Sequence, residues 1–311
     1  MKPGLRWLMP ALLVLMLASC ADSAPTGAAV EVVDPAFIAA QEQWRAQRRE
    51  ELLQPDGWTS LVGLHWLELK SHYIGSGGGS GIRLAHGPTR MGLVQQDRER
   101  VWFQPEAGVA LTEGGKPLKG RIEFKSEADA TPTVIGFDAG KGRLTLIERG
   151  GRRALRLRHA DAGTRLGFSG LAYWPSAPSW QLQASFLPHP AGRTMPIVDI
   201  TGTSTDTPNP GVVEFTRAGR TYKLEALAGE GDALFLVFAD RTSGHGSYPA
   251  GRFLDAPAPD ADGKVMLDFT RAYNPPCAFT AFATCPLPPP ENRLDLAIEA
   301  GEKNYTPPTS K

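Results

Sequence analysis

The chain of 311 residues has no excess of charge of either sign, little cysteine, and no hydrophobic run long enough for a convincing membrane-spanning helix. Lysine and arginine together number 33, as do aspartate and glutamate, so the formal net charge is zero. Nucleic-acid-binding proteins use an excess of basic side chains to neutralise phosphates. The charge balance therefore argues against a nucleic-acid partner.

Several functional signatures are absent as well. No Gly-x-Ser-x-Gly sequence occurs, so we do not expect a serine hydrolase of that type. The glycines within 75–81 lack the Lys-Ser/Thr ending of a phosphate-binding loop, and we interpret them as a flexible hairpin tip. Seven residues separate Cys277 from Cys285, whereas paired zinc ligands usually have about two to four residues between them. We expect neither a metal nor a cofactor.

Glycine and proline are, by contrast, abundant, at 34 and 27 residues. Both exceed their average shares of roughly 7% and 5%, which favours turns and short strands over helices. Short apolar runs recur about every ten residues from 91 to 187, with Gly, Pro or Asp between them. The sequence therefore predicts a mainly β fold, an antiparallel sandwich or barrel-like sheets.

The second half continues this pattern. Leu234 to Phe238 form a continuous apolar run that predicts a buried strand, and the alternation of Leu294, Leu296 and Ile298 with other residues predicts a last strand. No repeat is visible, so a solenoid or propeller is not expected. We predict a single β-rich domain over 34–305, with two β subdomains dividing near 188–210 as the alternative.

One amphipathic helix is predicted near the N-terminus of this domain. Asp34 and Pro35 have the residue types of an N-cap and a first helical position. Apolar residues then recur among charged ones as far as Leu53. We expect a helix over 35–53 that packs across a sheet.

The first twenty residues indicate export. Lys2 and Arg6 precede an apolar segment, and Leu17-Ala18-Ser19 stands directly before Cys20, which resembles the lipobox of a bacterial lipoprotein. The resemblance implies a signal peptide over 1–19, a lipidated Cys20 carrying palmitate, and a tether over 20–33. It further implies a membrane-anchored protein of the cell envelope, and Ala21 favours the periplasmic face of the outer membrane. The alternative is an ordinary cleaved signal with a chance cysteine.

Export also bears on the other two cysteines. In an oxidising compartment Cys277 and Cys285 are candidates for a disulfide, which would stabilise the fold by roughly 2–3 kcal/mol. Free thiols remain the alternative.

A basic cluster stands out between residues 149 and 158. It comprises Arg149, Arg152, Arg153, Arg156 and Arg158. Because Arg156 and Arg158 alternate with leucines, we interpret the cluster as the solvated face of a strand. The rival interpretation is an anion site, in which arginines bind a carboxylate or phosphate.

Several strings spread over 57–303 are distinctive: GWTSLVGLHWLE, LFLVFADRTSG, YPAGRFL, LDFTRAYNPPCAF and ATCPLPPPENRLDLAIEAGEK. They resemble an uncharacterised bacterial and archaeal family, domain of unknown function 1684. The resemblance implies no activity or ligand. Family members without an obvious export signal also carry the cysteine pair. The alternative is therefore that the pair serves the polar residues of the motif and does not mark an oxidising compartment.

Two hypotheses for function follow. The first is a ligand-binding or structural β module that takes a small molecule or glycan of the envelope, with four candidate ligand-binding residues: Arg252, Arg271, Tyr273 and Asn274. The second is a hydrolase-like enzyme with carboxylates in a pocket bordered by 268–302, the candidates being Asp240, Asp268 and Glu299. The structural alternative for these residues is a set of internal ion pairs, Asp240 with Arg252 and Asp268 with Arg271.

Overall fold

The computed structural model describes Met1 and residues 34–307. The predicted signal peptide, the lipidated Cys20 and the tether lie outside the described residues. Within 34–307, no helix has the length and apolar character needed to cross a membrane. Residues 34–307 form one compact unit.

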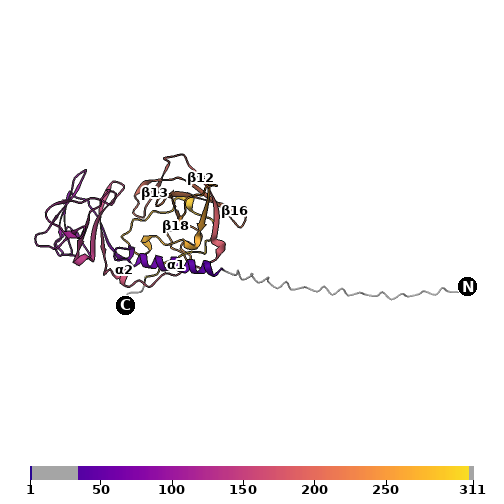
Figure 1. Ribbon diagram of the computed structural model, residues 1–311, viewed down its shortest axis with the longest axis horizontal. Coiled ribbons are helices and arrows are strands. Elements are labelled where there is room, and N and C mark those ends of the chain that lie inside the picture. Colours follow the sequence, from indigo (N-terminus) through magenta and orange to yellow (C-terminus); the bar gives the residue numbers. More distant parts are fainter. Residues whose placement is uncertain (2–33, 308–311) are drawn as a thin grey trace. The chain divides into compact units, whose positions relative to one another are not determined.

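The predicted N-terminal helix is confirmed as α1 (Pro35–Leu52), and Figure 1 shows it lying against the C-terminal half. Asp34 caps it by accepting a hydrogen bond from the Ala36 N–H at 2.9 Å. Its contacts with the rest of the chain are largely polar, because Arg45 and Arg48 both reach side chains more than a hundred residues away in sequence. The helix is therefore held by hydrogen bonds and ion pairs as much as by an apolar stripe.

The mainly β fold is also confirmed, and the strands of residues 61–159 form two sheets that are antiparallel except for the pair β2–β3. The first has the order β1-β11-β10-β9-β6-β7 and the second β3-β2-β4-β5-β8. The bounds are β1 Leu61–Trp66, β2 Ser71–Gly75, β3 Ile82–Arg83, β4 Gly92–Gln96, β5 Val101–Pro105, β6 Thr112–Glu113, β7 Lys116–Pro117, β8 Ile122–Glu123, β9 Val134–Phe137, β10 Gly142–Arg149 and β11 Arg152–His159. Side chains from both sheets share one core, which includes Phe103, Leu144 and Leu155.

The glycine-rich segment differs from the prediction. β2 and β3 pair in parallel, with Ile74 opposite Ile82, and the antiparallel neighbour of β2 is β4. Residues 76–81 are therefore a connection between parallel strands and not the tip of a hairpin. Because Gly75 lies against the Thr89 backbone, a β-carbon there would meet the Thr89 carbonyl oxygen.

The C-terminal half contains a six-stranded sheet of order β18-β17-β16-β15-β12-β19. Its edge strands β18 and β19 lie against each other, so the sheet nearly closes into a barrel. The bounds are β12 Gln181–Pro188, β13 Thr194–Val198, β14 Ser204–Pro208, β15 Gly211–Arg217, β16 Arg220–Ala228, β17 Leu234–Phe238, β18 Arg252–Ala256 and β19 Lys264–Asp268. Its interior is packed with apolar side chains such as Phe215, Leu236 and Leu267.

β11 is the last strand of the two N-terminal sheets, and β12 is the first strand of the C-terminal sheet. The segment between them contains the short helix α2 (Gly163–Leu166) and the 3-10 turn η3 (Pro178–Trp180). The region 188–210, considered above as a dividing point, forms the separate hairpin β13–β14. This hairpin lies within the C-terminal half.

The predicted last strand is wrong. Residues 293–299 form no strand, although Leu294 and Ile298 are buried in the C-terminal core. The segment is instead held by isolated contacts, among them the hydrogen bond from the Ile298 N–H to the Asp240 carboxylate at 2.7 Å. The Asp240 carboxylate takes the place of the backbone carbonyl that a neighbouring strand would supply to the Ile298 N–H. The alternating burial of Leu294 and Ile298 therefore arises without a strand.

The interpretation of Arg156 and Arg158 as a solvated face is also wrong. The side chain of Arg156 is only 5% exposed, and that of Arg158 is partly buried. Leu155 and Leu157 face the N-terminal core on one side of β11, while the two arginines pack against Trp58 on the other. Both faces of the strand are covered, which the alternation of residue types alone cannot reveal.

Candidate ligand-binding site

A cavity of about 400 Å³ opens where α1, the 3-10 turn η1 (Trp58–Ser60), β17, β18 and the 3-10 turn η5 (Pro276–Ala278) meet. We call it the aromatic pocket. It is lined by Trp44, Arg48, Glu51, Trp58, Phe235, Phe253, Asp255, Tyr273 and Pro276. Five of these nine residues are aromatic, and three carry a charge.

The strands position the aromatic side chains. Phe235 on β17 and Asp255 on β18 stand opposite each other, so both point to the same face of the sheet. Phe253, two residues before Asp255, shares this face and exchanges two backbone hydrogen bonds with Tyr273, each 2.9 Å long. The ring centroids of Phe235 and Phe253 are 4.9 Å apart and those of Phe253 and Tyr273 are 5.8 Å apart, both in edge-to-face geometry.

Asp255 and Tyr273 form a polar pair within these aromatic walls. The Tyr273 hydroxyl donates a hydrogen bond to Asp255 Oδ2 at 2.9 Å. Burial, followed by the nearby Asp255 carboxylate, raises the pKa of Tyr273 far above its ordinary value. Burial also raises the pKa of Asp255, against the lowering effect of the hydrogen bond from Tyr273. The phenol therefore stays protonated at neutral pH and donates its hydrogen bond to Asp255, so it is not available as a general base.

Arg48 forms one wall of the pocket. Its guanidinium carbon lies 4.7 Å from the centroid of the Tyr273 ring, and its Nε is 3.0 Å from Glu302 Oε1. Its Nη2 donates to the Asn274 carbonyl oxygen at 3.0 Å. Glu302 is fully buried and also accepts the Asn274 N–H at 2.7 Å. These bonds lock Arg48 in place, so it shapes the pocket more than it offers a free charge.

A buried ionic network lies in the interior of the C-terminal half. Arg252 and Asp240 have fully buried side chains, with Arg252 Nη2 placed 3.2 Å from Asp240 Oδ2. The same guanidinium donates to the carbonyl oxygens of Ile298, at 2.9 Å, and of Ala300. Thr242 Oγ1 donates to Asp240 Oδ1 at 2.8 Å. This network fixes the chain around 298–302, and no solvent reaches its charges.

The candidate residues from the sequence thus fall into separate places. Asp240 and Arg252 pair in the interior, Asn274 is buried and bonds to Glu302, and Tyr273 lines the aromatic pocket. Asp268 and Arg271 pair with each other at 3.3 Å.

The three candidate carboxylates do not meet. Glu299 is exposed, Asp240 is buried beside Arg252, and Asp268 accepts hydrogen bonds from Gln181 and from the Thr270 backbone. None of the three lines the aromatic pocket. The structural alternative, in which Asp240 pairs with Arg252 and Asp268 with Arg271, is confirmed.

Sequence reasoning missed most of the pocket. Trp44 and Arg48 are four residues apart on α1 and so share one helix face, a signal that could have been used. Asp255 is the polar residue facing outward among buried neighbours in β18. No sequence pattern, however, brings the helix, Trp58 and β18 to one place.

Cys277 and Cys285 form a disulfide, with their Cα atoms 6.2 Å apart. Both pack in an apolar cluster with Trp58, Phe253 and Tyr273. The disulfide thus braces the proline-rich segment that carries Pro276 at the pocket edge. Among the described residues, no group of three or more His, Cys, Asp and Glu side chains is arranged to hold a metal ion.

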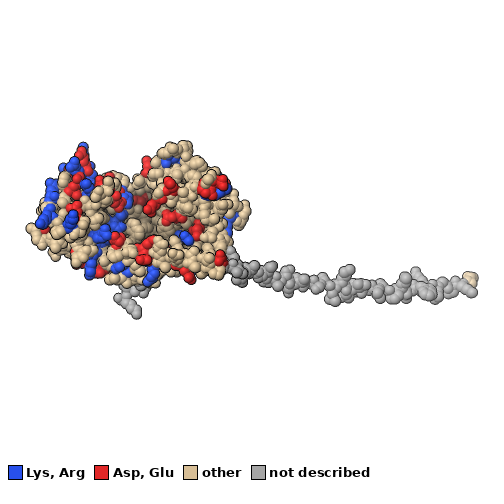
Figure 2. All heavy atoms as spheres, in the orientation of Figure 1, with Lys and Arg blue, Asp and Glu red and all other residues tan. Residues whose placement is uncertain are grey.

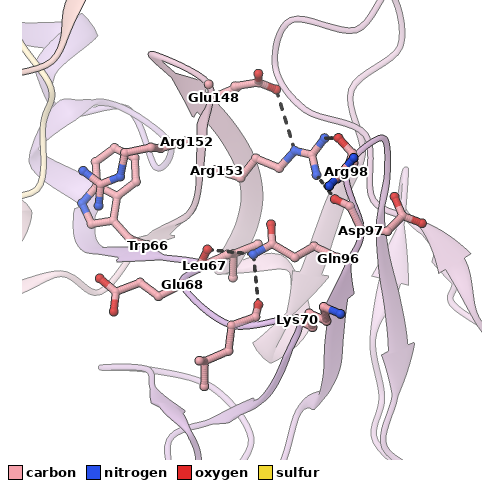
Figure 3. A pocket seen from close by; sticks show the side chains of 12 residues that line it. Trp66, Leu67, Glu68, Lys70, Gln96, Asp97, Arg98, Glu148, Arg152 and Arg153 are labelled. Atoms are coloured by element: carbon pink, nitrogen blue, oxygen red, sulfur yellow. Dashed lines mark hydrogen bonds and ion pairs between the residues drawn. The ribbon is translucent and has the colours of Figure 1, made fainter.

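A larger cavity, about 730 Å³, lies beside the β10–β11 turn (Figure 3). Its central polar side chains bind backbone carbonyl groups: Arg153 donates to Asp97 and Arg98, and Gln96 donates to Leu67 and Leu69. These groups join neighbouring loops of the N-terminal sheets. The polar side chains of this cavity therefore serve to hold the loops together, and we do not assign a ligand to it.

Residues 166–303 match the family described as protein of unknown function, DUF1684. An uncharacterised protein of Haloarcula marismortui, solved by NMR in solution, is 32% identical over 45% of this chain and 78% of its own, with a TM-score of 0.37. No curated protein matches the chain. The matched region includes the pocket residues from Phe235 to Pro276, whereas those of α1 and η1 precede it. The chain belongs to the DUF1684 family of proteins of unknown function.

Proposed function

We propose that the protein is a lipid-anchored protein of the cell envelope whose β-rich domain binds a small organic ligand in the aromatic pocket. The observation that carries the binding function is the pocket itself, in which four other aromatic residues line the cavity together with the hydrogen-bonded pair of Asp255 and Tyr273. Ligand sites typically combine apolar and aromatic walls with a few placed polar groups.

The lining favours a ligand with flat apolar faces and hydroxyl donors. Aromatic rings offer wide apolar contact area, and the exposed Asp255 carboxylate on β18 accepts hydrogen bonds. A glycan of the envelope has both features, since the faces of a sugar ring are apolar and its edge carries hydroxyl groups. A small molecule of similar shape would satisfy the same groups.

Replacing Asp255 with asparagine should weaken the binding of such a ligand about tenfold or more, because a charged acceptor is lost from the pocket lining. Titration calorimetry of the mature protein against a panel of envelope glycans, peptides and small molecules would measure this. Asp295→Asn is the matched control, since Asp295 lies on the surface with Arg220 and Arg241. The proposal fails if no compound binds, or if binding is the same in both variants.

A hydrolase-like function is the second candidate, because Asp255 and Glu51 both line the pocket. Burial raises the pKa of Asp255, which would suit a general acid, and Glu51 would then act as the base. A compound that binds could be tested for turnover. Asp255→Asn would abolish turnover in an enzyme, and recovery of the ligand unchanged after incubation with the wild-type protein would exclude this candidate.

The anchor can be tested separately. Replacing Cys20 with serine should abolish the incorporation of labelled palmitate and move the protein from the membrane to the soluble fraction of the cell, because the lipid supplies the membrane affinity. Density-gradient separation of the two membranes would show whether the wild-type protein is in the outer one. A Cys20→Ser protein that stays in the membrane fraction would contradict the anchor.

A further inference from the structure

Five arginines lie on one face of the sheet formed by β1, β10 and β11, the face opposite the N-terminal core. One of them, Arg152, packs over the Trp66 ring, and the other four are Arg143 and Arg149 on β10, and Arg156 and Arg158 on β11. Arg143 stands directly opposite Arg158 in the antiparallel register, so their side chains share this face. We call the four residues the arginine face.

The arginine face is short of negative charge. Asp56 pairs with Arg143, while Glu127 is shared between Arg149 and Arg156, with 3.1 Å between Arg156 Nη1 and Glu127 Oε2. Four guanidinium groups thus meet two carboxylates. Arg158 forms no side-chain hydrogen bond or ion pair with any residue in 34–307, although its Nε is buried.

This shortage is unfavourable for the folded chain alone. A buried charge normally needs a partner, because removal from water costs several kcal/mol per ion. The Arg156 side chain is only 5% exposed, and its Nε also lacks a partner. Burial, with the repulsion of Arg158 and Arg149, lowers the pKa of Arg156 to about 10 despite the opposing effect of Glu127. Burial likewise lowers the pKa of Arg158.

The arginine face also adjoins two cavities. The guanidinium carbons of Arg156 and Arg158 lie 5.6 Å and 5.4 Å from the ring centroid of Trp58, which lines the aromatic pocket. Arg149 lines a cavity of about 340 Å³ together with the hydroxyl-bearing side chains of Thr205, Thr207 and Thr284. Figure 2 shows basic and acidic side chains gathered on opposite sides of a hollow in the surface.

We propose that Arg156 and Arg158 bind an oxyanion, a carboxylate or phosphate group, next to Trp58. Guanidinium groups bind such groups through paired N–H donors, and they are readily desolvated. The anion would supply the negative charge that the arginine face lacks. It is either a free ion or the acidic group of a ligand that extends into the aromatic pocket.

Inorganic phosphate is a suitable probe, added to the mature protein in phosphate-free buffer of low and constant ionic strength. Phosphate should raise the thermal unfolding temperature of the wild-type protein in a saturable manner. Arg158→Met should bind phosphate about tenfold more weakly or not at all. Without phosphate this variant should unfold no earlier than the wild type, because it removes a charge that has no partner.

Two further variants sharpen the test. Glu127→Gln should tighten phosphate binding, because it removes the carboxylate that competes for Arg156. Arg98→Met, in an exposed loop of the N-terminal half, should leave binding unchanged. An unfolding temperature that phosphate does not raise, or raises equally in Arg158→Met, would overturn the proposal, the latter result indicating an adventitious ion only.

The source of the anion can be distinguished with phenyl phosphate. If the oxyanion belongs to a ligand that reaches the aromatic pocket, phenyl phosphate should bind more tightly than phosphate, and Phe235→Leu should remove the difference while leaving phosphate binding intact. Equal binding of the two compounds would identify a free ion as the occupant. In that case the anion site is confirmed, while ligand binding in the aromatic pocket receives no support from it. The experiment thus distinguishes failure of the anion site from failure of the proposed ligand-binding function.

Discussion

Replacing Arg252 with methionine is expected to lower the free energy of unfolding by about 3–5 kcal/mol, because the change leaves a buried carboxylate without its counter-ion. Arg252 and Asp240 are both fully buried. The carbonyl oxygens of Ile298 and Ala300 would lose their donors as well. Urea denaturation of the purified mature domain would measure the effect.

Two companion variants test the cause. Arg241→Met removes a neighbouring arginine whose side chain is 65% exposed and pairs with Asp295, and it should change stability by less than about 1 kcal/mol. Arg252→Met combined with Asp240→Leu should recover part of the loss, since no buried charge remains unpaired. If Arg252→Met were as stable as Arg241→Met, the buried pair would not be a main support of the fold.

The second large effect is expected at Asn292, whose replacement by alanine should destabilise the protein by about 3 kcal/mol. Its side-chain oxygen accepts the Glu225 N–H at 2.7 Å, and its amide donates to the carbonyl oxygens of Glu225 and Val237, each at 2.9 Å. The residue is 1% exposed, so water cannot replace these bonds without rearrangement. Asn292 thus joins the 3-10 turn η6 (Pro290–Asn292) to β16 and β17.

Asn304→Ala is the control for this prediction, because Asn304 is exposed and is held through its backbone N–H, which bonds to Gly246. Chemical unfolding of both variants under the same conditions gives the comparison. A loss below about 1 kcal/mol in Asn292→Ala would mean that the freed backbone groups find other partners.

Local patterns were sufficient to predict α1 and most strands. The Asp34–Pro35 pair predicted the start of the helix correctly, and the apolar run from Leu234 to Phe238 has the same bounds as β17. Both predictions depend on interactions within a few residues of the chain. They therefore hold in any tertiary structure that buries the apolar side chains. The pairing of Asp240 with Arg252 was the structural alternative considered from the sequence, and it forms because Asp240 follows β17 just beyond the point where Arg252 begins the neighbouring β18.

The rest depended on contacts between distant segments. Ile298 sits in an alternating apolar pattern, yet its backbone bonds to the Asp240 side chain and not to a strand. Arg156 alternates with leucines like a solvated residue, yet Trp58 covers it. The aromatic pocket combines residues from Trp44 to Pro276, so no local pattern could assemble it.

The ion pair between Arg48 and Glu302 joins residues that are 254 positions apart. Such a contact closes almost the whole described chain into a loop, and loop closure of this length slows folding. A chain emerging from the ribosome cannot form this contact until Glu302 has been made. Arg48 is therefore synthesised long before its partner, and α1 is fixed in its final position only after Glu302 has joined the fold.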